Sequence, residues 1–205
     1  MNMVVADVIQ NIREAISATD AITWIATLTA VIYVILALKE NILCWSFGII
    51  SSSLSIYVYY QELLWYEAIL NFAYVILGFY GWMVWRKKSA SESTQIISKI
   101  KISLFLIILS GGVLVSLVLG YISKTYTAST LPFADAAITT LSIIATWMTA
   151  KKYLENWIVW IVVDGFAAGV YIYKGPELYL FALLFIFYSF IAIAGYYSWR
   201  RKLIQ

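Results

Sequence analysis

Long apolar runs separated by short polar breaks dominate the chain. A helix needs about 20 apolar residues to cross the hydrocarbon core of a bilayer. Seven runs meet this length, at residues 21–38, 42–60, 63–85, 100–122, 132–150, 156–174 and 177–199. They are continuous, whereas the strands of a membrane β-barrel alternate over about ten residues. The pattern therefore predicts an all-α integral membrane protein with seven transmembrane helices.

Composition supports a membrane protein and excludes some kinds of site. Of the 205 residues, 63% are hydrophobic and 12% are charged, more apolar surface than a soluble domain of this length can bury. The chain has no histidine and one cysteine, Cys44, so a His/Cys metal site and an internal disulfide are excluded. We expect no cofactor, no nucleic-acid partner and no enzymatic activity. A membrane enzyme or receptor is the alternative from a different class.

Basic residues lie mainly on one side of the predicted bundle. All but three of the 14 Lys and Arg residues fall in the odd-numbered loops and the C-terminal tail; the exceptions are Arg13, Lys124 and Lys174. Cytoplasmic loops of membrane proteins carry such an excess of positive charge. We therefore predict a multi-pass membrane protein with its N-terminus outside and its C-terminus in the cytoplasm.

The chain divides into five segments. Residues 1–20 lack the pattern of a signal peptide, and their apolar residues share one helical face, so either an interfacial helix or a frayed extension fits. The other segments are a first three-helix unit (21–85), a basic linker with a fourth helix and an outer loop (86–131), a second three-helix unit (132–199) and a basic tail (200–205).

The two three-helix units resemble each other in sequence. With an offset of 115 residues, Glu40 and Asn41 align with Glu155 and Asn156, and Trp45 aligns with Trp160; with an offset of 114, Tyr74, Gly81 and Trp85 align with Tyr188, Gly195 and Trp199. One helix separates the units, so they enter the membrane from the same side. The sequence thus predicts a 3+1+3 arrangement of parallel repeats, with a substrate site between them near the midplane.

Asp164 is an acid inside a membrane-spanning run. It lies eight residues into its helix, about 12 Å from the end at 1.5 Å per residue, which is near the centre of a core about 30 Å thick. Burying a charge there costs at least about 2.5 to 3.5 kcal/mol on insertion scales. Either a substrate or a hydrogen bond to a neighbouring helix compensates this cost, and we favour the substrate.

Two tryptophans share a helix face with this acid. Trp157, Trp160 and Asp164 occupy positions i, i+3 and i+7. Flat aromatic surfaces beside an anion suit a planar, cationic or heteroaromatic ligand. The alternative is a belt of aromatic residues at the membrane interface, to which we mostly assign the tryptophans beside basic residues, namely Trp82, Trp85 and Trp199.

Other polar residues enter the predicted runs. Asn71 reaches a depth similar to that of Asp164, while Glu67 lies one turn from the outer end, where a carboxylate can also extend to water. The Glu155 and Asn156 pair and its copy at Glu40 and Asn41 begin helices, where capping alone explains an acid followed by Asn.

Two motifs together resemble the PnuC family of bacterial vitamin transporters. The first is the stretch from Lys152 to Trp157 with Trp160 and Asp164; the second is Tyr80, Gly81 and Trp82 with Trp85. The resemblance covers about residues 24 to 201. We predict a substrate site made of Trp45, Glu67, Asn71, Tyr74, Asn156, Trp157, Trp160 and Asp164.

This resemblance implies a fold similar to the SWEET sugar transporters, uncoupled facilitated diffusion, and trapping of the substrate by phosphorylation by a cytoplasmic kinase. It also implies a homotrimer in the bacterial cytoplasmic (inner) membrane. Nicotinamide riboside is the expected substrate. Many nicotinamide-riboside members have Gln where Asn71 stands and Asn where Gly78 stands, so a thiamine transporter of the same family is the alternative.

Overall fold

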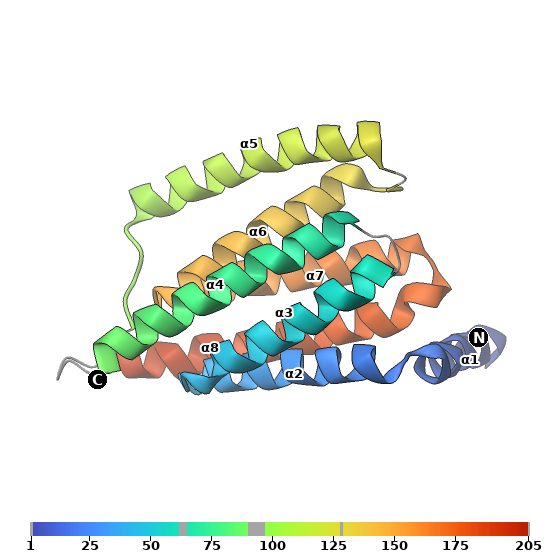
Figure 1. The fold of residues 1–205 in the computed structure, drawn as a ribbon, viewed down its shortest axis with the longest axis horizontal. Coiled ribbons are helices and arrows are strands. Elements are labelled where there is room, and N and C mark those ends of the chain that lie inside the picture. The colour runs from blue at the N-terminus through green and yellow to red at the C-terminus, as the bar shows by residue number, and fades with distance from the viewer. Residues whose placement is uncertain (1, 62–64, 90–96, 128, 205) are drawn as a thin grey trace.

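The computed structural model describes residues 2–61, 65–89, 97–127 and 129–204, which are largely helical (Figure 1). Its α-helices are α1 (Asn2–Ala18), α2 (Ala21–Leu38), α3 (Leu43–Gln61), α4 (Trp65–Ser89), α5 (Ile102–Tyr126), α6 (Pro132–Ala150), α7 (Asn156–Lys174) and α8 (Tyr179–Ile204). A short 3-10 helix, η1 (Pro176–Leu178), precedes α8. Within these ranges the extended backbone is limited to one isolated bridge between Ser98 and Tyr153. The prediction of an all-α protein is therefore confirmed.

Six helical segments are long and apolar enough to cross a membrane, namely α2, α4, α5, α6, α7 and η1 with α8. The bounds of α2, α6 and α7 coincide with the predicted runs, whereas α4, α5 and α8 continue several residues past the predicted C-terminal limits. The remaining predicted span corresponds to α3, which has 19 residues and contains five serines. These serines lower the mean hydropathy of α3, and for this reason α3 is not among the six segments that are apolar enough to cross a membrane.

The membrane helices form two packed groups. In the first helix group α3 packs between α2 and α4, and in the second helix group α7 packs between α6 and α8. The groups meet where α4 contacts α6 and where α2 contacts α8. Helix α5 packs against α6 at the edge of the bundle, and α1 lies at one end, against α8 and η1 (Figure 1). Helix α5, which lies between the two groups along the chain, thus packs on the outside of the bundle.

Local chemistry explains several helix starts. The Asp20 carboxylate accepts hydrogen bonds from the backbone N–H groups of Ile22 and Thr23, at 2.7 and 2.9 Å, and caps α2. Asn41 accepts from the N–H of Leu43 at 2.9 Å, which confirms capping at α3. At α7 the capping prediction is wrong, because the side chain of Asn156 bonds to Tyr153 and Thr149 and not to an N–H of the first turn. The carboxylate of Glu155 accepts instead from the N–H of Ile100 in the linker, at 3.0 Å.

Candidate functional site

A cavity of about 750 Å³ lies between the two helix groups and is lined by residues of α2, α3, α4, α6, α7 and α8. Its size is typical of sites that enclose a small organic molecule. The lining includes all of the predicted site residues except one: Trp45, Glu67, Asn71, Tyr74, Trp157, Trp160 and Asp164. The structure therefore brings together, around one cavity, predicted site residues from three different helices, α3, α4 and α7.

Helix α7 supplies one wall of the cavity. Trp157, Trp160 and Asp164 all line it, as their shared helix face predicts. Asp164 is 3% exposed, and within the described residues its carboxylate makes no hydrogen bond or ion pair. Tyr74 of α4 and Tyr188 of α8 lie near enough to interact with it electrostatically. The hydrogen bond to a neighbouring helix, the structural alternative for Asp164, is thus absent from the described part of the chain.

Helix α4 supplies the facing polar residues. The side-chain amide of Asn71 donates to the backbone carbonyl of Glu67 at 2.9 Å, and its amide oxygen accepts no hydrogen bond from the described residues. Glu67 lies in the first turn of α4 and also faces the cavity. Its carboxylate has no ion-pair partner among the described residues. The cavity therefore carries two carboxylates, Glu67 and Asp164, that no basic side chain in the described ranges neutralises.

Asn156 is the predicted site residue that does not line the cavity. Its side chain is fully buried, donating to the carbonyl of Tyr153 at 2.6 Å and accepting from the hydroxyl of Thr149 at 3.0 Å. Both ends of the amide are therefore used in fastening the start of α7 to the end of α6. These two hydrogen bonds account for a buried Asn at this position without any contact to a ligand.

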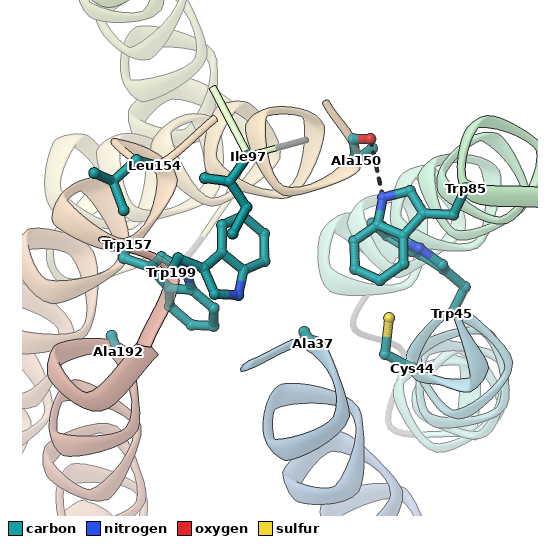
Figure 2. Close-up of a cluster of buried hydrophobic side chains, with 10 residues drawn as sticks. All are labelled: Ala37, Cys44, Trp45, Trp85, Ile97, Ala150, Leu154, Trp157, Ala192 and Trp199. Carbon is teal, nitrogen blue, oxygen red and sulfur yellow. Dashed lines mark hydrogen bonds between the residues drawn. The ribbon is translucent and has the colours of Figure 1, made fainter. Parts of the chain in front are cut away.

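Four tryptophans close one end of the cavity. Trp45 packs edge-on against Trp85, with ring centroids 5.5 Å apart, and Trp157 packs in the same way against Trp199, at 5.3 Å (Figure 2). Trp85 donates to the carbonyl of Ala150 at 3.0 Å, and Trp199 donates to that of Leu38 at 3.1 Å. Each bond crosses from one helix group to the other.

These contacts revise the assignment of the tryptophans near the basic residues. Trp85 and Trp199 are 5% and 0% exposed, so they belong to the core and not to an interfacial belt. Trp82, at 37% exposed, remains compatible with a belt. The sequence pattern could not separate them because all three precede basic residues at the end of a helix.

The same contacts recur in both helix groups and define how the groups correspond. Glu40 and Lys152, which are 112 positions apart, both have left-handed backbone conformations, with φ of 56° and 55°. Trp45 and Trp157 are separated by the same 112 positions. The ring of Trp45 lies against Gly81 of the next helix, and the ring of Trp157 lies against Gly195 of the next helix.

The offset of 115 residues for the first two helices of each group is therefore wrong by three. Trp45 corresponds to Trp157 and not to Trp160, while Ser52 corresponds to Asp164. The offset of 114 for the third helix agrees with the structure, because Trp85 and Trp199 make matching contacts. An alignment shifted by three residues is shifted by nearly one helical turn, so the aligned residues still lie on the same helix face. A comparison of hydrophobic and polar patterns therefore does not detect the shift.

Sequence comparison decides the family. A profile of the nicotinamide mononucleotide transporter family matches residues 20–201. The chain belongs to this family of membrane transporters. The nicotinamide riboside transporter PnuC of Neisseria mucosa is 29% identical to it over 188 residues, covering 86% of this chain and 71% of the relative. The PnuC of Escherichia coli is 22% identical over 206 residues, covering 87% of this chain and 85% of the relative.

A solved structure shares the fold of the transporter. The crystal structure of a vitamin B3 transporter, PnuC, superposes with a TM-score of 0.72 and covers 98% of this chain and 89% of that one, at 24% sequence identity. The resemblance to the PnuC family is thus confirmed, as is the prediction that the chain is a multi-pass membrane transporter and not an enzyme.

Hydroxyl groups form a second part of the transporter cavity that the sequence reasoning did not identify. They come from two helices that face it, α3 and α6: Ser51, Ser52, Ser55, Thr139, Ser142, Thr146 and Thr149. The four residues of α6 are spaced by three or four positions, which is a helical period visible in the sequence. Such a pattern does not by itself indicate a cavity, because Ser and Thr are common in membrane helices, where they bond to their own backbone.

A charged bridge links the helix groups at the end that carries most of the basic residues, here called the basic end. Glu40, between α2 and α3, accepts hydrogen bonds from Lys152 and Lys202, each at 2.6 Å. Lys152 lies between α6 and α7, with its ammonium group 4.7 Å from the ring centre of Trp85. The bridge therefore lies against Trp85, one of the four tryptophans, and ties the first helix group to the second.

Acid is expected to weaken this bridge. Burial raises the pKa of Glu40, but the hydrogen bonds and charges of Lys152 and Lys202 outweigh burial and hold the pKa below its ordinary value of 4.5. An acid with a lowered pKa stabilises the fold above its unfolded pKa, and this contribution is lost as the pH falls through the folded pKa. We therefore expect the melting temperature of the detergent-solubilised transporter to fall below a pH of about 4.5.

The Glu40→Gln variant is the test of this cause. It should melt at a lower temperature than the wild type at pH 7 and lose part of the acid dependence. Glu177→Gln, which changes an exposed acid of η1, is the control and should behave like the wild type. If Glu40→Gln and the wild type lose stability in parallel on acidification, the bridge does not contribute.

Proposed function

We propose that the transporter imports nicotinamide riboside, a vitamin B3 precursor, by facilitated diffusion. The observation that carries the proposal is the unpaired carboxylate of Asp164 in a cavity that two tryptophans, Trp157 and Trp160, also line. A pyridinium ring is flat and positively charged, so it stacks on indole rings and pairs with a carboxylate. The names of the PnuC relatives, which are nicotinamide riboside transporters, support the same substrate.

In this proposal α3 is a seventh transmembrane helix. It has 19 residues, which extend about 28 Å at 1.5 Å per residue, and it packs between α2 and α4. The two helix groups are then parallel repeats in a 3+1+3 order, joined by α5, as in the SWEET-like fold. The matching tryptophan contacts at Gly81 and Gly195 support this symmetry.

Transport would proceed by alternating access to the cavity. The basic end faces the cytoplasm, in keeping with the positive-inside bias, and the N-terminus lies outside. In the state described here, the Glu40 bridge and the tryptophan bonds to Ala150 and Leu38 hold the basic end closed. Release of the substrate inward requires these contacts between the groups to separate, after which a cytoplasmic kinase traps the substrate by phosphorylation. By family resemblance, the assembly is a homotrimer.

Thiamine is the second candidate substrate. It also carries a cationic heteroaromatic ring, which the wall of α7 can contact in the same way. Many nicotinamide-riboside members have Gln where Asn71 stands and Asn where Gly78 stands, and both positions line the cavity. These two differences from the family pattern therefore affect residues that can contact the substrate. A longer side chain at position 78 would displace Ile49, since even a Cβ there would lie 2.6 Å from that side chain.

Uptake into proteoliposomes tests the proposed function. Labelled nicotinamide riboside should enter saturably, stop at equal concentrations inside and outside when no kinase is present, and be unaffected by a protonophore. Thiamine should compete weakly. Saturable uptake of thiamine without nicotinamide riboside would select the second candidate. Accumulation above the external concentration that a protonophore abolishes would overturn the uncoupled mechanism.

A further inference from the structure

The serines of α3 differ sharply in their surroundings. Ser51 donates to the backbone carbonyl of Ala26 at 2.8 Å and so fastens α3 to α2. Ser53 is exposed on the outer surface and does not line the cavity. Ser52 and Ser55 do line it, and their hydroxyl groups hydrogen-bond to no other group in the described part of the chain. These two hydroxyls are therefore available to a molecule in the cavity.

A serine in a membrane helix normally satisfies its hydroxyl on its own backbone. Thr140 and Thr146 of α6 do so here, each donating to the carbonyl four residues earlier at 2.8 Å. Ser52 and Ser55 make no such bond, although both are partly buried. Leaving a polar group unpaired in an apolar environment is unfavourable. The arrangement is therefore explained by a hydrogen-bonding partner that enters the cavity.

The positions of these serines place them opposite the aromatic wall. Ser52 precedes Asp164 by 112 residues, the separation by which the first two helices of the groups correspond. It therefore occupies in the first helix group the depth that Asp164 occupies in the second, and Ser55 lies one turn further along α3. A ligand between the groups meets two indoles and a carboxylate of α7 on one side. On the other side it meets the two free hydroxyls of α3 and, nearer the basic end, the indole of Trp45.

We propose that Ser52 and Ser55 bind the sugar hydroxyls of the substrate and select a glycosylated pyridinium over one without a sugar. This assignment rests on the proposed function. Each serine hydroxyl donates one hydrogen bond and accepts up to two, so the pair matches neighbouring hydroxyl groups of a ribose. The α7 wall recognises the ring and its charge, whereas the α3 wall recognises the polyol.

Binding measurements with two ligands separate these roles. Nicotinamide riboside and 1-methylnicotinamide carry the same cationic ring, but only the first has a sugar. The S52A/S55A variant should bind nicotinamide riboside about tenfold more weakly than the wild type, since each neutral hydrogen bond contributes roughly twofold to tenfold. Its affinity for 1-methylnicotinamide should be unchanged, which also reports that the variant is folded. Ser53→Ala is the matched control and should bind both ligands like the wild type.

Each other result has a definite meaning. Equal affinity of S52A/S55A and the wild type for nicotinamide riboside overturns the assignment, because water then satisfies these hydroxyls. A parallel loss for both ligands also overturns it and marks the serines as structural. If the wild type binds neither pyridinium ligand, the proposed function fails and the assignment falls with it, whereas the first two results leave the proposed function intact.

Discussion

Asp164→Asn should bind nicotinamide riboside about 30-fold to several thousand-fold more weakly than the wild type. Removing one member of a buried charge pair costs about 2 to 5 kcal/mol, and Asp164 is 3% exposed. Asn keeps the size of the side chain and removes its charge. Isothermal titration with the purified transporter measures the loss, and uptake into proteoliposomes should fall in parallel.

Two comparisons isolate the charge as the cause. Nicotinamide is uncharged but keeps the ring and the amide, so its weak affinity should change little in Asp164→Asn. Glu177→Gln removes an exposed carboxylate outside the cavity and should leave both affinities unchanged. If Asp164→Asn binds nicotinamide riboside as well as the wild type, this carboxylate is not the counter-charge of the substrate.

Gly195→Ala should destabilise the transporter by about 1 to 3 kcal/mol, the usual range for overpacking a core. A Cβ at this position would lie 2.6 Å from the ring of Trp157, which is 2% exposed and cannot move aside without disturbing Trp199. Gly81→Ala should act in the same way on Trp45, because its Cβ would meet that indole. Because Trp45 and Trp157 both line the cavity, substrate affinity should fall as well.

Two glycines of α7 provide matched controls. A Cβ at Gly165 or Gly169 would have no neighbour within 4 Å, so alanine there should leave stability unchanged or raise it by up to about 1 kcal/mol through helix propensity. Thermal melting of all four variants in detergent is the measurement. Equal melting temperatures for Gly195→Ala and Gly165→Ala would contradict the close packing of Trp157 on α8.

In the proposed transport cycle, the Glu40 bridge and the four tryptophans close the basic end. The tryptophan bonds appear twice, once in each direction across the groups, whereas the charged bridge appears once. If the two groups were identical here, both the α2–α3 loop and the α6–α7 loop would carry an acid. The α6–α7 loop has Lys152 at the position where the α2–α3 loop has Glu40. Opposite charges at corresponding positions allow the two loops to attract each other directly.

Much of the site could be predicted from the sequence because helices have a fixed period. The face shared by Trp157, Trp160 and Asp164 depends only on spacing within one helix, and all three line the cavity. Asn156 shows the limit of this reasoning. It belongs to the same motif, yet its amide bonds to Tyr153 and Thr149, and neither partner can be deduced from helical spacing.

Residues that act across the helix groups could not be predicted. Glu40 meets residues 112 and 162 positions away, and the contacts depend on how two groups of helices come together. Ser52 and Ser55 differ from Ser51 and Ser53 only in what faces them. Their sequence context is the same run of serines.

The sequence by itself determined the apolar helices, the family and the helix face that carries Asp164, since each depends on composition, motif or a local period. Only the tertiary structure decided that Trp45 corresponds to Trp157 and that Ser52 lies at the depth of Asp164. A slip of nearly one turn leaves a helix face unchanged but moves each residue about 5 Å along the axis. Hydrogen bonds and ring contacts between helices are sensitive to that distance, whereas hydropathy is not.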